Sequence, residues 1–163
     1  MGGFDQNFTF FTVGKLPSPV PLLAFPPPSC CSFLPKLYSF SLGLKYLDPA
    51  DPRRYQPAIL KADDLDDRTK ARILRAEAAF ANGLETLAFY AAAVAAVNMQ
   101  GVDPVAANIL SLLYLASRVV YNLVYVVLQD NPRWALVRSM TWFCGIGIIF
   151  AMFFLAGTAA RYK

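Results

Sequence analysis

Three long apolar stretches, each containing a charged residue, constrain this chain more than any other feature of its sequence. The stretches cover residues 84–102, 104–128 and 135–160. Each is close to or above the ~20 residues with which a helix crosses a bilayer. Their charges are Glu85, Arg118 and Arg138, and a charge at the centre of a membrane helix costs at least ~2.5 kcal/mol. Because such charges usually face the interior of a bundle, we predict an all-α integral membrane protein in a lipid bilayer, with a functional polar interior.

The composition excludes several classes of function. The 163 residues suit one domain, and 56% of them are hydrophobic. The chain contains no histidine, which excludes Ser-His-Asp and Cys-His catalysis and histidine ligands to a metal. The cysteines at positions 30, 31 and 144 lack the spacing of a metal site or a disulfide framework. The cations between residues 61 and 75 alternate with acidic residues rather than forming a basic stripe, so we predict no nucleic-acid partner.

Prolines divide the chain into two unlike parts. Residues 1–47 are dense in proline, which costs ~3 kcal/mol inside a helix, so we predict an irregular segment without a 20-residue span. Residues 48–163 should form the transmembrane domain, opening with a loop at 48–62. A helix should begin within residues 63–67, where carboxylates suit the positive end of the helix dipole, and continue into the first apolar stretch.

Two Asx-Pro pairs mark the turns between the predicted membrane helices. Asp103 and Asn131 suit the N-cap position, and Pro104 and Pro132 suit the first helical position. They predict spans at about 80–101, 104–129 and 133–160, whose short connections make consecutive spans antiparallel neighbours. Lys and Arg are concentrated before the first span and in the turn between the second and third, so we expect that side to be cytoplasmic.

Polar side chains lie on all three spans; on the first two they share a helix face, and on the third they cluster near the cytoplasmic end. They are Asn82 and Glu85 on the first span, Arg118, Tyr121 and Tyr125 on the second, and Arg138 and Ser139 on the third. One interpretation is a structural network in which Glu85 faces Arg118 or Arg138 across the bundle, because an unpaired charge in hydrocarbon is costly. The other is a site for a small anionic ligand with one ammonium group, since arginines bind carboxylates in bidentate fashion and Glu85 would bind the amine.

Three motifs in this order resemble the MAPEG family, the membrane-associated proteins of eicosanoid and glutathione metabolism. The first is RAEAAFANGLETLAF at residues 75–89, the second is SRVVY at residues 117–121 followed by Tyr125, and the third is the pair Arg138-Ser139. The resemblance covers residues 48–163 and implies a four-helix membrane fold, whose first helix is missing or degenerate here. It also implies a homotrimer with sites between protomers, in the endoplasmic reticulum or another endomembrane.

The resemblance implies a chemistry as well as a fold. Glutathione would be the co-substrate of a transferase or peroxidase acting on lipophilic electrophiles or hydroperoxides. Arg138 and Ser139 would be catalytic and would stabilise the thiolate. The remaining site residues would bind the peptide: Arg75 and Arg118 its carboxylates, Glu85 its amine, and Asn82, Tyr121 and Tyr125 the rest.

Two replacements keep a second class of function open. Phe80 stands where many family members have histidine, and Trp142 stands where some active members have tyrosine. They favour the alternative of a non-catalytic MAPEG-like membrane protein that binds lipid or acts as a scaffold. A small transporter subunit is less favoured, because no span is broken at mid-membrane.

Overall fold

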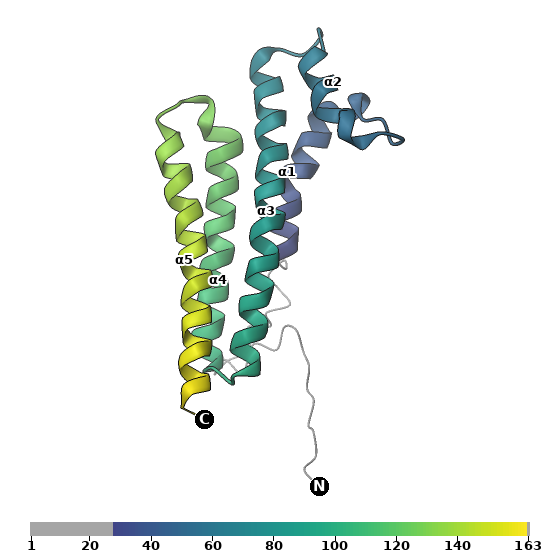
Figure 1. Cartoon of the computed structure of the whole chain (residues 1–163). Helices are drawn as coiled ribbons and strands as arrows, with labels where there is room; N and C mark the ends of the chain where they lie inside the picture. Colours follow the sequence, from purple (N-terminus) through teal and green to yellow (C-terminus); the bar gives the residue numbers. More distant parts are fainter. Residues whose placement is uncertain (1–27, 163) are drawn as a thin grey trace, which may run out of the picture.

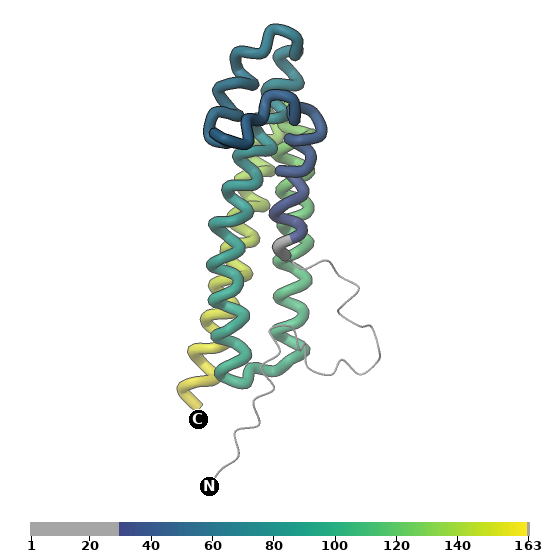
Figure 2. The backbone as a smooth tube through the Cα atoms, turned by 90° about the vertical axis from the view of Figure 1, so that its right-hand side faces the viewer, coloured from purple at the N-terminus to yellow at the C-terminus, as the bar shows by residue number. Residues whose placement is uncertain are grey.

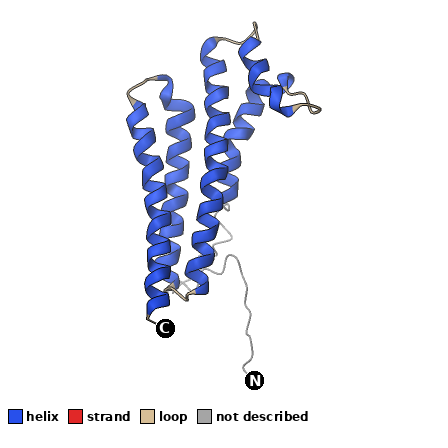
Figure 3. Cartoon of the chain, in the orientation of Figure 1, coloured by secondary structure: helices blue, strands red, loops and turns tan. Residues whose placement is uncertain are grey.

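The computed structural model describes residues 28–162 as a bundle of helices, with no strand among them (Figures 1 and 3). The helices are α1 (Pro28–Gly43), α2 (Tyr55–Lys61), α3 (Asp67–Met99), α4 (Pro104–Asn122) and α5 (Trp134–Arg161). Four short segments join or extend them: 3-10 turns at Leu44–Tyr46 and Pro52–Arg54, a π-helical segment at Leu123–Val127 and a 3-10 turn at Leu128–Asp130. The last two continue α4 to the turn before α5.

Within residues 28–162, three helices are long and apolar enough to span a membrane, which confirms the predicted helical membrane bundle. They are α3, α4 with its extension to Asp130, and α5. The three run antiparallel in sequence order, and the α4–α5 turn lies at the same end of the bundle as α2 (Figure 1). Large apolar side chains cover the outside, among them Leu136, Phe143 and Phe154. Such a surface suits lipid and not water, so the protein is an integral membrane protein.

The predicted helix caps are present, with one shift. The Asp66 side chain accepts from Thr69 N at 3.1 Å and starts α3, as the 63–67 prediction required. Asp103 accepts from Ala106 N at 3.1 Å, with Pro104 first in α4. Asn131 accepts from Arg133 N at 3.0 Å, but α5 begins only at Trp134. The predicted start at Pro132 is therefore wrong by two residues, because the chain makes a 3-10-like turn before the regular helix.

Helix α1 corrects the prediction that residues 1–47 are irregular. Residues 28–43 form a helix despite Pro35 in its interior. Proline removes the hydrogen bond to the carbonyl four residues earlier, here that of Cys31. The Asn122 side chain of α4 donates to this carbonyl at 2.9 Å and replaces the lost partner. The remainder of the predicted segment, residues 1–27, lies outside the described residues.

The described part of α1 is shorter than a full membrane span. It has 16 residues, against the ~20 that a bilayer requires. It lies against α3 over the half of the bundle nearer α2 (Figures 1 and 2). Close approach is possible because Gly83 faces it, and Ser32 donates to the Gly83 carbonyl at 3.3 Å. The part of α1 that the structure shows is thus consistent with the expected degenerate first helix.

A buried ion pair fixes α1 to α3. Lys36 Nζ lies 2.6 Å from a carboxylate oxygen of Glu77, whose side chain is only 7% exposed. Ser39 donates to the other carboxylate oxygen at 2.6 Å. The Tyr55 hydroxyl at the start of α2 donates to the Ser39 carbonyl at 2.9 Å. The network supplies the charged partner that a buried Glu77 needs, and it attaches α2 to the same place.

An apolar core joins α3, α4 and α5 at the opposite end. Tyr90 and Tyr114 stack with ring centroids 4.3 Å apart and planes 5° from parallel. Val97, Ile149 and Met152 are fully or almost fully buried around them. This packing holds the three spans together below the polar region, which therefore sits on a rigid base.

Candidate functional site

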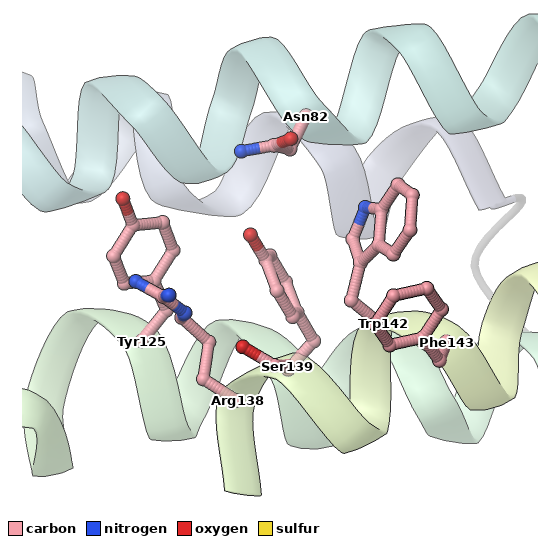
Figure 4. A pocket seen from close by; sticks show the side chains of 7 residues that line it. Asn82, Tyr125, Arg138, Ser139, Trp142 and Phe143 are labelled. Carbon is pink, nitrogen blue, oxygen red and sulfur yellow. The ribbon is translucent and has the colours of Figure 1, made fainter. Parts of the chain in front are cut away.

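A pocket of about 260 Å³ opens between α3, α4 and α5. The lining side chains are Asn82 from α3, Tyr121 and Tyr125 from α4 and its π-helical segment, and Arg138, Ser139, Trp142 and Phe143 from α5. Five of these seven are site residues predicted from the sequence: Asn82, Tyr121, Tyr125, Arg138 and Ser139. Residues up to 61 positions apart in the chain are thus brought into one cavity (Figure 4).

Arg138 supplies the positive charge of the pocket. Its guanidinium carbon lies 4.9 Å from the centroid of the Tyr125 ring, and Figure 4 shows the two side chains against each other. Arg138 is half-buried and forms no ion pair with a carboxylate of any described residue. A half-buried cation without an anionic partner is available to an anion that enters the pocket.

Hydroxyl groups surround this cation, and one of them is already engaged. The Tyr121 and Tyr125 rings meet edge to face with centroids 5.6 Å apart. Ser139 Oγ donates to the Ala135 carbonyl at 3.1 Å within its own helix. The sequence interpretation expected the Ser139 hydroxyl to donate to a ligand. For this it would first have to rotate away from the Ala135 carbonyl.

The pocket has an aromatic wall on one side. Trp142 and Phe143 lie edge to face with centroids 5.1 Å apart, next to each other in Figure 4. Phe143 is 62% exposed on the outer surface of the bundle, so this wall borders the surface that contacts lipid. Sequence reasoning did not select Phe143, although its position next to Trp142 in the third span was a usable signal.

Arg118 lies beneath the pocket and not in its lining. The side chain is 3% exposed, between the rings of Tyr114 and Tyr121 at 5.5 and 5.1 Å. Its Nη2 atom donates to the carbonyls of Thr141 and Trp142 at 3.3 and 3.4 Å. These contacts join Arg118 to the α5 backbone, and the direct contact with a ligand that the sequence suggested stays a prediction.

Glu85 corrects a second expectation. It is exposed on α3 and forms no ion pair or hydrogen bond with any residue in 28–162. The predicted pair with Arg118 or Arg138 is therefore absent within one chain. The inward face of α3 is instead formed by Gly83, Thr86 and Tyr90, so Glu85 points to the side of the helix.

Arg75 is held at the edge of the site by a cluster that the sequence interpretation missed. Asp130, at the end of the α4 extension, binds Arg68 Nε at 2.7 Å, Arg72 Nη2 at 2.6 Å and also Arg75. Arg75 Nη2 donates to the Val126 carbonyl at 3.3 Å as well. The cluster could have been found from the spacing of the three arginines, which places them on one face of α3.

The comparison with protein families agrees with the motifs. The model of the MAPEG family matches residues 38–158, a range that contains every lining residue of the pocket. No curated protein and no solved structure matches the chain. The matched range begins at residue 38, inside α1, and so includes only the last part, residues 38–47, of the segment that the sequence alone indicated as irregular.

Proposed function

The chain belongs to the MAPEG family, and on that premise we propose that it binds glutathione and uses the thiol on lipophilic molecules in the membrane. It would transfer the thiol to an electrophile or reduce a hydroperoxide. The observation that carries the proposal is the unpaired guanidinium of Arg138, set in a pocket that has a polar wall and an aromatic wall. A reaction between a thiolate and a hydrophobic molecule needs both walls: a polar one for the thiolate and an aromatic one for its co-reactant.

The residues present fit the peptide in chemical type. A cysteine thiol has a pKa near 8.5, so little thiolate exists at neutral pH without a cation beside it. Arg138 would stabilise the thiolate, and the released proton would pass to water on the cytoplasmic side. Asn82, Tyr121 and Tyr125 would hydrogen-bond the peptide. Arg75, at the edge of the site, would bind a carboxylate after partial release from Asp130.

The reaction follows from the two walls. In transfer, the thiolate sulfur forms a bond to an electrophilic carbon held at Trp142 and Phe143, and the leaving group departs with the bonding electron pair. In reduction, the sulfur attacks the outer oxygen of a hydroperoxide and the O–O bond breaks. An alcohol and the sulfenic acid of the peptide result, and a second thiol converts the latter to a disulfide and water. Both reactions start from the same thiolate.

Glu85 fits this proposal only in an assembly. It is exposed and forms no ion pair in a single chain, and a carboxylate without a cationic partner in hydrocarbon is costly. A homotrimer with sites between protomers would place Glu85 beside the pocket of a neighbour, where it would bind the amine of the peptide. On the same family grounds we propose the endoplasmic reticulum or another endomembrane as the location.

The test uses purified protein in detergent, with thiolate absorbance and turnover of an aryl halide as readouts. Arg138→Ala should lose about 10²–10³ in rate, the usual cost of removing a donor that stabilises a developing or reactive anion. Glutathione affinity should fall much less, because the lost contact acts on the thiolate and not on the bound thiol. Glu85→Ala should chiefly weaken binding. The exposed cation Arg133, in the preceding turn, gives the control Arg133→Ala, which should behave as wild type.

The alternative is a non-catalytic protein that binds lipid or acts as a scaffold on the same fold. One observation favours it: Trp142 offers no hydroxyl on the turn of α5 that follows Arg138, and Ser139 donates within its own helix. If the wild-type protein forms no thiolate and turns nothing over, this alternative replaces the catalytic proposal. If Arg138→Ala is as active as wild type, only the role of Arg138 is wrong.

A further inference from the structure

Arg118 is a buried cation without an anion. Its side chain is 3% exposed, and none of the carboxylates in residues 28–162 pairs with it. Its Nε and Nη1 atoms are buried without a hydrogen-bond partner in the described part of the chain. An arrangement this costly inside a membrane protein requires a specific reason.

A glycine provides the space for this side chain. A Cβ atom at Gly145 would lie 2.9 Å from Arg118 Cζ and 3.1 Å from Ser117 Oγ, and closer still to Arg118 Nη2. Any other residue at position 145 would therefore displace the guanidinium. Gly147, two residues further along α5 and on its exposed side, shows the contrast, because a Cβ there would meet nothing within 4 Å. Of these two glycines, only Gly145 is required by packing.

The guanidinium connects α4 to the part of α5 that carries the pocket. It is held on α4 between Tyr114 and Tyr121, at 5.5 and 5.1 Å. On α5 it donates to the carbonyls of Thr141 and Trp142, three and four residues after Arg138. Tyr121 and Trp142 both line the pocket. The Arg118 side chain thus bridges α4 and α5 directly beside two residues that line the pocket.

We propose that Arg118 is a positioning residue, which locks α5 against α4 so that Trp142 and Arg138 stand at the pocket, and that Gly145 is the residue that admits it. The positioning is independent of the reaction. Its chemical consequence, the placement of Arg138 beside the thiolate, rests on the function proposed above. A displacement near 1 Å at a reacting group costs about 10²-fold in rate. A shift of α5 should therefore lower the turnover rate.

The experiment compares Gly145→Ala with Gly147→Ala, which add the same methyl group to the same helix. Two readouts are used in detergent. The first is the fluorescence of Trp142 in a Trp134→Phe background, where Trp142 is the only tryptophan. The second is thiolate formation and turnover with glutathione and an aryl halide. Gly145→Ala should shift the emission and quenching of Trp142 and reduce turnover by about 10²-fold, with glutathione affinity changed by no more than about threefold. Gly147→Ala should change neither readout.

A second pair of variants covers the case in which Gly145→Ala folds poorly. Arg118→Met removes the guanidinium and with it the clash, so adding Gly145→Ala to Arg118→Met should have almost no further effect. This non-additivity would identify Arg118 as the reason for the glycine. If Gly145→Ala and Gly147→Ala affect Trp142 alike, or if the two substitutions are additive, the inference is overturned. If Trp142 responds only to Gly145→Ala while the wild type forms no thiolate, the positioning stands and the proposed function fails.

Discussion

The ion pair between Lys36 and Glu77 should be the strongest single attachment of α1. We consider the substitution Lys36→Met, which keeps the length of the side chain and removes its charge. The Glu77 carboxylate, 7% exposed, would then retain only the hydrogen bond from Ser39 at 2.6 Å. The ammonium contact with the Phe40 ring, at 4.6 Å, would be lost as well.

The size of the effect follows from this burial. Breaking a buried pair by removing one partner typically costs 3–5 kcal/mol, because the other charge stays buried without compensation; we expect about that loss for Lys36→Met. The pair Arg54–Asp51 is the control, since its side chains are 81% and 43% exposed. Pairs this exposed contribute at most ~1 kcal/mol, which sets the limit for Arg54→Met.

The assay is equilibrium unfolding in mixed micelles, followed by circular dichroism. Adding Glu77→Leu to Lys36→Met should restore most of the stability, because the unpaired carboxylate is then gone. If Lys36→Met costs no more than Arg54→Met, the buried pair does not hold α1 and this reasoning is refuted.

Two further predictions concern the end of the bundle near α2. Gly43→Ala would place a methyl carbon 2.6 Å from the Tyr55 hydroxyl, so overpacking should cost about 1–3 kcal/mol in the same unfolding assay, whereas Gly157→Ala, with nothing within 4 Å, should be neutral. For Asp64, the hydrogen bond from Lys45 lowers the pKa from 3.8 to about 2; since the depressed pKa belongs to the folded state, the stabilisation is complete above about pH 4 and is lost as the pH falls through about 2. The difference in Tm between wild type and Asp64→Asn should therefore close over this interval, and a difference that stays constant with pH would contradict the assignment.

The three spans could be predicted because two strong physical constraints act on them. A bilayer fixes the length of an apolar helix, and hydrocarbon leaves no alternative to the helix for the backbone. The Asx-Pro pairs then fixed the starts of α4 and, within two residues, α5. The grouping of Tyr121 with Tyr125 followed from helix periodicity, and Arg138 and Ser139 are neighbours in the sequence, so the spans had only to pack side by side for these residues to meet.

Helix α1 could not be predicted, because its stability comes from outside the segment. Helix propensities treat Pro35 as a break. Nothing in the local sequence shows that Asn122, 91 positions after Cys31, donates to the Cys31 carbonyl that Pro35 leaves without a partner. Glu85 failed for a related reason. Helix periodicity places Glu85 near Asn82 on α3, but it does not show which side of α3 the other helices will pack against. The position of α1 could not be predicted from the sequence, so the buried side of α3 could not be predicted either.

The proline in α1 also has a consequence for the order of assembly. Before α4 is in place, the Cys31 carbonyl has no donor, and an unsatisfied backbone group costs several kcal/mol in hydrocarbon. The hydrogen bond from Asn122 removes this cost, so we expect α1 to become more stable once α4 has been synthesised and has packed against it. Translation delivers α1 before α4, so the hydrogen bond that completes α1 forms only after a segment 91 positions later in the chain has been made.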